Sequence, residues 1–270
     1  MRRVILDLLR CPKCRFGTLA PDSDTAEVAF GPVHCVACQA SFPVGEGVVD
    51  LAADRAEPSG VQRNFERPLV ARSYERYVRP AVQMAISGRR LDRDSELVMY
   101  RSLIGRPDAP VLDLGCGTAM FARRLARDPE LPPVVGMDVS KAMLEEAMAQ
   151  TREAGVMVDF VRAEAPSLPF QDQSLGAVLQ SGSLHLIEDA ARLFVEVGRV
   201  LRPGGRYVAS TYVPPSFLGS MLHRKAGLYP RGEDELRGGL AAAGLVCFER
   251  MVLPPFILVR AEKRAGPALR

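Results

Sequence analysis

The stretch that decides the fold is residues 111–120, Val-Leu-Asp-Leu-Gly-Cys-Gly-Thr-Ala-Met. An apolar run that contains Asp113 passes into a glycine-rich turn, and the helix-forming stretch 121–127 follows. This order predicts a buried parallel strand, a tight turn and a helix start, the place where open α/β sheets bind cofactors. Gly115 and Gly117 let backbone N–H groups approach a ligand, and the helix N-terminus attracts an anionic group.

The composition limits the size of the core, the kinds of partner and the cell compartment that we expect. The chain has 270 residues and is 47% apolar, enough for one large core and a small appended domain. Its net charge of +3 admits nucleic acid as a partner without indicating one. The apolar N-terminal stretch is interrupted by Asp7 and lacks a small-residue cleavage site, so we expect no signal peptide. No apolar run approaches the ~20 residues of a membrane helix, and we expect a cytoplasmic protein with reduced thiols.

Four of the six cysteines form two Cys-x-x-Cys pairs separated by 20 residues: Cys11, Cys14, Cys35 and Cys38. This spacing predicts a tetrahedral Cys₄ site for structural Zn²⁺, with two disulfides or a redox pair as alternatives. His34 is an alternative ligand. Since four cysteines fill every coordination position, the zinc would stabilise a small domain and leave no open position for chemistry. Residues 41–51 are typical of the closing hairpin of a zinc ribbon.

The composition changes twice along the chain, which predicts three parts: a zinc ribbon at 1–53, a linker and helical lid segment at 54–93, and a catalytic domain at 94–270. Residues 61–93 carry eight arginines and three acids, with apolar and aromatic positions that suggest one or two amphipathic helices. This segment is either a phosphate-facing basic patch or lid, or the solvated face of a helix packed on the sheet. Tyr74 and Tyr77 are its candidates for contact with a cofactor.

From residue 94 onward, strand and helix patterns alternate, which predicts a Rossmann-like, doubly wound and mainly parallel α/β sheet. We expect seven strands, at 109–114, 134–138, 156–161, 176–180, 206–211, 246–252 and 256–262. Helices are expected at 96–104, 119–127, 141–154, 190–201 and 233–243. The last two strands should form an antiparallel hairpin at one edge, and Ser140 should cap the helix that begins at residue 141.

Three positions select the cofactor. A dinucleotide-binding loop has a third glycine three residues after the second, where this chain has Met120. Asp113, just before the loop, would repel a pyrophosphate but suits a ligand with a positive amino or sulfonium group. Asp138 ends the next predicted strand and is placed to bind two ribose hydroxyls. The combination favours S-adenosylmethionine over NAD.

Five ordered motifs resemble those of class I S-adenosylmethionine-dependent methyltransferases: residues 111–118, 136–138, 163–170, 183–185 and 199–205. The resemblance covers about residues 95–262. It implies that the glycines pass under the methionine part, that Asp113 orders the loop, and that Asp138 binds the ribose. The full set of expected cofactor-binding residues is Asp113, Gly115, Cys116, Gly117, Asp138, Val139, Met143, Glu164, Ala165, Gln180 and Ser181. Within it, Val139 and Met143 would flank the adenine, Glu164 would bind its amino group, and Gln180 and Ser181 would lie beside the transferable methyl group.

The cysteine-rich head resembles two groups of methyltransferases: the zinc-ribbon ribosomal-RNA guanine-N1 enzymes, and plant plastid and bacterial enzymes without an assigned substrate. The RNA enzymes usually have His where this chain has Cys38. The stretch 180–185, Gln-Ser-Gly-Ser-Leu-His, is similar to methyltransferases of small molecules such as quinones. The pieces Phe-Glu-Arg-Pro at 65–68 and Tyr-Glu-Arg at 74–76 resemble the plant and bacterial group.

The sequence therefore predicts an enzyme of class EC 2.1.1 that methylates O, N or C of a small-molecule acceptor and releases S-adenosylhomocysteine. His185 is the candidate base because the unperturbed pKa of histidine is near neutral, although it could equally cap or pack under the next helix. Tyr212 and His223 follow the fifth strand, where acceptor pockets are commonly shaped. The first alternative is a methyltransferase of rRNA or tRNA bases that holds RNA with its ribbon and arginine-rich segment. The second is a non-catalytic protein-docking module; the oligomeric state stays open.

Overall fold

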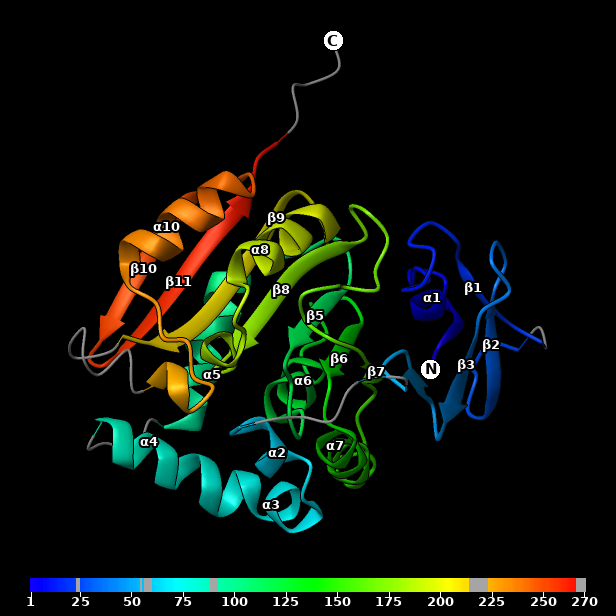
Figure 1. Ribbon diagram of the computed structural model, residues 1–270, viewed down its shortest axis with the longest axis horizontal. Helices are drawn as coiled ribbons and strands as arrows, with labels where there is room; N and C mark the ends of the chain where they lie inside the picture. Colours follow the sequence, from blue (N-terminus) through cyan, green and yellow to red (C-terminus); the bar gives the residue numbers. More distant parts are fainter. Residues whose placement is uncertain (23–24, 54, 56–59, 88–91, 214–222, 266–270) are drawn as a thin grey trace.

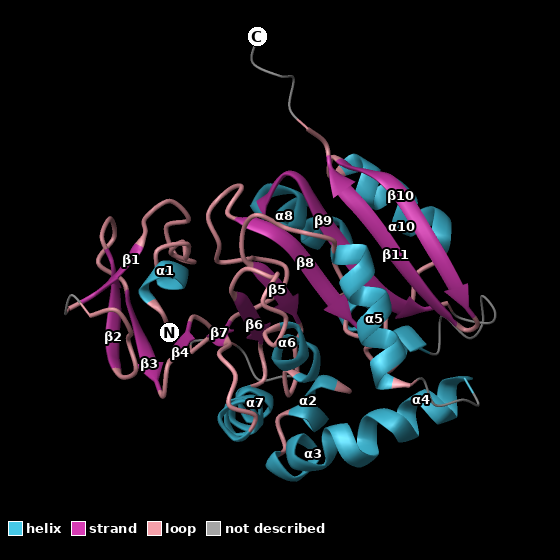
Figure 2. Cartoon of the chain, turned by 180° about the vertical axis from the view of Figure 1, so that it is seen from behind, coloured by secondary structure: helices cyan, strands magenta, loops and turns pink. Residues whose placement is uncertain are grey.

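The computed structural model describes residues 1–22, 25–53, 55, 60–87, 92–213 and 223–265. Its described strands form one mixed sheet of 11 strands in the order β1-β2-β3-β4-β7-β6-β5-β8-β9-β11-β10 (Figure 1). Helices cover both faces of this sheet, as the opposite views of Figures 1 and 2 show. Within the predicted linker and lid segment at 54–93, residues 54, 56–59 and 88–91 lie outside the described residues.

The seven strands predicted after residue 94 are present. Five are parallel neighbours: β5 (Val111–Leu114), β6 (Val134–Asp138), β7 (Asp159–Arg162), β8 (Leu175–Ser181) and β9 (Leu201–Tyr212). The predicted edge hairpin is confirmed, since β10 (Leu245–Leu253) pairs antiparallel with β11 (Phe256–Lys263), which pairs antiparallel with β9. Because β5 lies between β6 and β8, its following loop marks the switch point where such sheets bind ligands.

The predicted limit of seven strands to the sheet is wrong, because the N-terminal part adds four more. These are β1 (Leu19–Pro21), β2 (Gly31–Cys35), β3 (Ser41–Gly45) and β4 (Val48–Asp50), preceded by helix α1 (Arg3–Leu6). Strand β4 pairs in parallel with β7, and Val49 stands opposite Val161 with both side chains buried. Without β4, strand β7 would present a row of unpaired backbone groups at an apolar edge. Leu9 and Phe170 extend the shared core, and neither is accessible to solvent.

The predicted helices after residue 92 are observed as α5 (Arg93–Ile104), α6 (Met120–Leu125), α7 (Lys141–Glu153), α8 (Ala190–Val200) and α10 (Glu233–Ala242). The first three pack on one face of the sheet and the last two on the other. The predicted cap of α7 is confirmed, because the Ser140 hydroxyl accepts a hydrogen bond from the Met143 N–H at 3.2 Å.

A lid, defined here as residues 62–87, crosses the carboxyl ends of the central strands. It consists of α2 (Gln62–Phe65), α3 (Pro68–Ser73), the π-helical turn η1 (Tyr74–Val78) and α4 (Arg79–Ser87), along the bottom of Figure 1. Glu75, in the π-helical turn, accepts hydrogen bonds from the Thr118 hydroxyl at 2.7 Å and from Arg123 at 2.8 Å. These bonds fix the lid to the glycine-rich loop and to α6. No helix in the described part of the chain is long and apolar enough to cross a membrane.

Candidate active site

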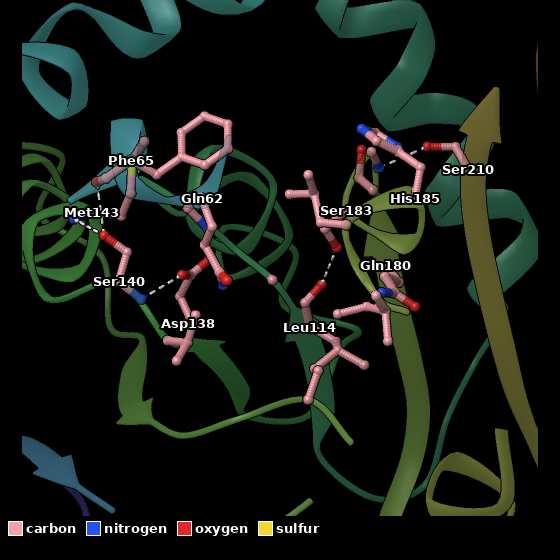
Figure 3. Close-up of a pocket in the computed structure, with 18 of the residues that line it drawn as sticks. Gln62, Phe65, Leu114, Asp138, Ser140, Met143, Gln180, Ser183, His185 and Ser210 are labelled. Carbon is pink, nitrogen blue, oxygen red and sulfur yellow. Dashed lines mark hydrogen bonds between the residues drawn. The ribbon is translucent and has the colours of Figure 1, made fainter. Parts of the chain in front are cut away.

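A cavity of about 500 Å³ lies between the lid and the carboxyl ends of β5, β6, β8 and β9. Figure 3 shows its two sides facing each other across an open space. Phe65, Asp138 and Met143 line one side, and Ser183 and His185 line the other. Phe65, Val78 and Val82 of the lid line the cavity.

The glycine-rich loop fits tightly against the loop that follows β8. Gly115 has a φ of +69° and Gly117 has a φ of +54°, both in the left-handed region. A Cβ on Gly115 would lie 2.4 Å from the Ser183 hydroxyl oxygen, which itself donates a hydrogen bond to the Leu114 carbonyl at 3.1 Å. Glycine at 115 therefore serves both the backbone conformation and the close approach of the two loops.

The substitution Gly115→Ala tests this packing against Gly155→Ala, its matched control. Gly155 has a similar φ of +61°, but open space surrounds the position where its Cβ would be. Both variants should lose about 1–2 kcal/mol of stability from the left-handed conformation. Only Gly115→Ala should also weaken S-adenosylhomocysteine binding, at least about tenfold, as measured by calorimetry. Equal affinities in the two variants would contradict the proposed role of the close contact.

The acids of the two central strands play different parts. Asp138 lines the cavity; its carboxylate accepts hydrogen bonds from the Gly117 and Ser140 N–H groups, both at 2.8 Å, and burial raises its pKa. Asp113 lies behind the cavity wall, where it accepts a hydrogen bond from the Ala122 N–H at 3.0 Å. Burial, opposed by that bond, raises the pKa of Asp113 to about 7. Asp113 thus orders the start of α6.

The raised pKa of Asp113 predicts a pH-dependent cost in stability. Below its ordinary pKa of 3.8 the folded and unfolded chains both hold the proton, whereas between 3.8 and about 7 only the unfolded chain releases it. Each unit of pH in this window costs the folded state about 1.4 kcal/mol, or about 4 kcal/mol in total. Asp113→Asn does not titrate and keeps an oxygen for the Ala122 N–H. Urea unfolding should therefore show the stability of Asp113→Asn rising relative to wild type between pH 4 and pH 8; a constant difference would contradict the assignment.

The residues expected around an adenine lie together at one end of the cavity. Val139, Met143, Glu164 and Ala165 all line it, as does Phe65 from the lid. The sequence did not point to Arg55, whose Nε lies 3.1 Å from the Glu164 carboxylate. Of the expected set, Cys116 is absent from the cavity wall: its sulfur points toward Gly136, and burial raises the pKa of the thiol well above its usual range.

A hydroxyl cluster stands where β8 and β9 end. The Tyr100 hydroxyl lies 2.9 Å from the hydroxyl oxygens of both Ser181 and Ser210, which come from these two strands. Gln180 and Ser181 line the cavity, as predicted. The fully buried Gln180 accepts a hydrogen bond from the Tyr207 hydroxyl at 2.5 Å, which fixes the orientation of its amide.

The rings of the three candidate catalytic residues form one chain of edge-to-face contacts, with interplanar angles of 61°. The ring centres of His185 and Tyr212 are 4.8 Å apart, and those of Tyr212 and His223 are 5.6 Å apart. His185 and Tyr212 line the cavity, whereas His223 does not. Burial, with smaller contributions from His223 and Arg231, lowers the pKa of His185 to about 4. The imidazole is therefore neutral at pH 7 and a weak base.

Arg231, which the sequence did not single out, holds the loop that carries His185. Its buried guanidinium donates hydrogen bonds to the carbonyls of Leu184, Ile187 and Glu188, at 3.3, 2.7 and 2.6 Å. An arginine has five donors in a fixed plane, so it can hold several carbonyls at once. Only the folded structure brings these carbonyls around it.

The rest of the cavity wall is largely apolar. Beyond the hydroxyl cluster the lining includes Gln83 and the apolar side chains of Val78, Val82, Met99, Leu253, Phe256 and Leu258. The charged pair in this wall, Arg79 and Glu96, is joined at 2.6 Å and buried. We call this part of the cavity the apolar chamber.

The four predicted metal ligands meet on the N-terminal domain, away from the cavity. The sulfur atoms of Cys11, Cys14, Cys35 and Cys38 all lie within 4.8 Å of one another. The pairs Cys11–Cys38 and Cys14–Cys35 have S–S distances of 3.7 and 3.6 Å, far longer than a disulfide. A tetrahedron with Zn–S bonds of about 2.3 Å has edges of about 3.8 Å, so the thiolates fit zinc. His34 lies instead 3.2 Å from Asp22.

Comparison with known proteins agrees with this site. Residues 111–205 match the family model described as "Methyltransferase domain". An uncharacterized chloroplastic methyltransferase of Arabidopsis thaliana is 31% identical over 287 residues, covering 95% of this chain and 79% of that protein. The ubiquinone/menaquinone biosynthesis C-methyltransferase UbiE of Desulfotalea psychrophila is 41% identical over 141 residues, 52% of this chain and 53% of that one.

The fold is also shared with a solved structure. The geranyl diphosphate C-methyltransferase of Streptomyces coelicolor, in complex with Mg²⁺, geranyl diphosphate and S-adenosyl-L-homocysteine, superposes with a TM-score of 0.56 at 20% identity. The match covers 63% of this chain and 77% of that one. The glycine loop that leaves no room for a Cβ, the acid at the end of β6 and the apolar end beyond it fit S-adenosylmethionine. The chain belongs to the class I S-adenosylmethionine-dependent methyltransferases.

Proposed function

We propose that this methyltransferase acts on a small, largely apolar acceptor that enters the apolar chamber. The observation that carries the proposal is the chamber wall, in which six apolar side chains lie beside Gln83 and the Arg79–Glu96 ion pair. A polyanionic acceptor such as RNA needs unpaired cations at its phosphates. Of the arginines that line the cavity, Arg55 and Arg79 are instead held by Glu164 and Glu96, and Arg192 is exposed on α8. The ubiquinone and menaquinone biosynthesis for which UbiE is named agrees with an apolar acceptor.

Some residues of the cavity would bind the cofactor, and others would orient the acceptor. Asp138 would hold the ribose hydroxyls, Val139 and Met143 the adenine, and the Gly115–Gly117 backbone the methionine part. When bound, S-adenosylmethionine supplies an electrophilic methyl group, so the protein mainly has to align the acceptor with it. The Tyr100 and Ser181 hydroxyls stand at the junction of the two parts and can orient a polar atom of the acceptor.

His185 suits orientation better than proton removal. At a pKa of about 4 the ring stays neutral through the physiological range and can accept a hydrogen bond from an acceptor hydroxyl. As a base it would be poorly matched to neutral pH. We therefore infer an acceptor that either needs no strong base or is already ionised when it is bound.

We also infer that the four cysteines hold one structural Zn²⁺, so that residues 1–53 form a zinc ribbon. The S–S distances support this assignment, and the filled tetrahedron leaves the metal without a position for substrate. The zinc would then contribute to stability alone.

A pair of neighbouring substitutions tests the apolar chamber. Val82 lines it and is 50% exposed, whereas Met84, two residues along α4, is 42% exposed and lies outside the lining. We expect Val82→Glu to lower methyl transfer from labelled cofactor into organic-extractable products of a cell extract at least tenfold. Met84→Glu should leave the transfer unchanged, and neither variant should alter S-adenosylhomocysteine affinity. Label in RNA, or equal activity of the two variants, would contradict the proposal.

A further inference from the structure

The ribbon reaches the cofactor end of the cavity through one pair of side chains. Asp50 is the last residue of β4, and it stands opposite Arg162, the last residue of β7. The Arg162 Nη1 lies 2.9 and 3.2 Å from the two carboxylate oxygens of Asp50. Both side chains are mostly buried, with exposed fractions of 16% for Arg162 and 23% for Asp50. The pair therefore closes the junction between the ribbon and the catalytic domain.

Arg162 also contacts the backbone that lines the cavity. Its Nε donates a hydrogen bond to the carbonyl of Val139 at 3.0 Å. Val139 and the preceding Asp138 both line the cavity. Two backbone hydrogen bonds connect the same segments. The Leu51 N–H donates to the Arg162 carbonyl at 2.9 Å, and the Ala163 N–H donates to the Asp138 carbonyl at 3.1 Å.

The geometry points to Asp50 as a positioning residue for cofactor binding: by fixing the Arg162 guanidinium, it holds the Asp138–Val139 backbone against the cofactor. This inference rests on the proposed placement of the adenosine at Asp138 and Val139. Arg162 uses different edges of its planar guanidinium for its two partners, with Nη1 facing Asp50 and Nε facing Val139. Without Asp50, the guanidinium gains freedom to turn away, and the carbonyl of Val139 loses its partner. The ribbon then contributes to affinity for the cofactor as well as to stability.

A second ion pair across the same junction provides the matched control. Asp159, at the start of β7, accepts hydrogen bonds from the Arg2 N–H and Nε, both at 2.7 Å, and is 4% exposed. It is absent from the cavity lining. Asp159→Asn should therefore weaken the junction as much as Asp50→Asn without any path to the cofactor.

The experiment is a calorimetric titration of S-adenosylhomocysteine into the full-length protein and its variants, with thermal unfolding measured alongside. Asp50→Asn should raise the Kd about tenfold, a usual size for coupling between two sites. Asp50→Glu, which keeps the carboxylate, should recover most of the affinity. Asp159→Asn should lower the unfolding temperature and leave the Kd within twofold of wild type.

A further variant separates affinity from folding. Arg162→Lys keeps the charge facing Asp50 but has a single nitrogen, which cannot serve both Asp50 and Val139 with the same geometry. It should bind as weakly as Asp50→Asn, and adding Asp50→Asn to it should cause little further loss. Unchanged affinity in Asp50→Asn and Arg162→Lys would overturn the inference. Failure of the wild-type protein to bind would instead contradict the proposed function.

Discussion

Replacing Cys35 by serine should empty the cysteine cluster and lower the unfolding temperature by more than 10 °C. The Cys35 sulfur is fully buried and lies 3.6 Å from that of Cys14. Structural zinc in small domains contributes about 10–16 kcal/mol of apparent binding free energy. The loss extends further, because β4 covers the edge of β7 and both belong to one continuous core.

Elemental analysis together with thermal unfolding measures this effect. Wild type should contain one zinc per chain and Cys35→Ser close to none. Cys247→Ser is the control, because Cys247 is exposed on β10 and takes no part in the cluster. A metal-free wild type that unfolds at the same temperature as Cys35→Ser would rule out structural zinc.

Asp138→Ala should weaken S-adenosylhomocysteine binding about 100-fold or more. The expected loss includes two charge-assisted hydrogen bonds to the ribose, each worth about 1.5–3 kcal/mol. It also includes the order of the loop, since the Asp138 carboxylate accepts from the Gly117 and Ser140 N–H groups at 2.8 Å.

Asp138→Asn separates these two roles, because its amide retains one acceptor oxygen. We expect Asp138→Asn to bind S-adenosylhomocysteine about tenfold more weakly than wild type, with a Kd between those of wild type and Asp138→Ala. Calorimetry gives all three Kd values, and circular dichroism checks that the variants are folded. An Asp138→Ala protein that binds within threefold of wild type would remove Asp138 from the cofactor site.

The parts of the fold that depend on local patterns could be predicted from the sequence. Strand β6 has the expected bounds, and the Ser140 cap follows from residue type and position. The glycine loop predicted the switch point, because a strand, two glycines and a helix start are adjacent in sequence. The arginine-rich segment proved helical, and its Val78 and Val82 line the cavity.

The missed features all depend on contacts between distant segments. In the sequence, the short strand β4 resembles the end of an independent hairpin. No neighbouring residue predicts its parallel pairing with β7, about 110 residues later in the chain. Pairing at a sheet edge uses backbone groups that every residue carries, so the side chains leave little local trace of it. Likewise, nothing in the sequence distinguishes Arg162 and Arg231 from the other arginines, because the carbonyls that they bind are brought near them only by the fold. The low pKa of His185 also comes from burial that the sequence alone could not show.

The most direct test of the account is a crystal structure of the protein with S-adenosylhomocysteine bound. We expect the ribose hydroxyls on Asp138, the adenine between Val139 and Met143, and the sulfur directed past Ser181 into the apolar chamber. Density for the ligand outside this cavity would contradict it. So would a sulfur atom that faces away from the chamber, toward the exposed surface of the ribbon.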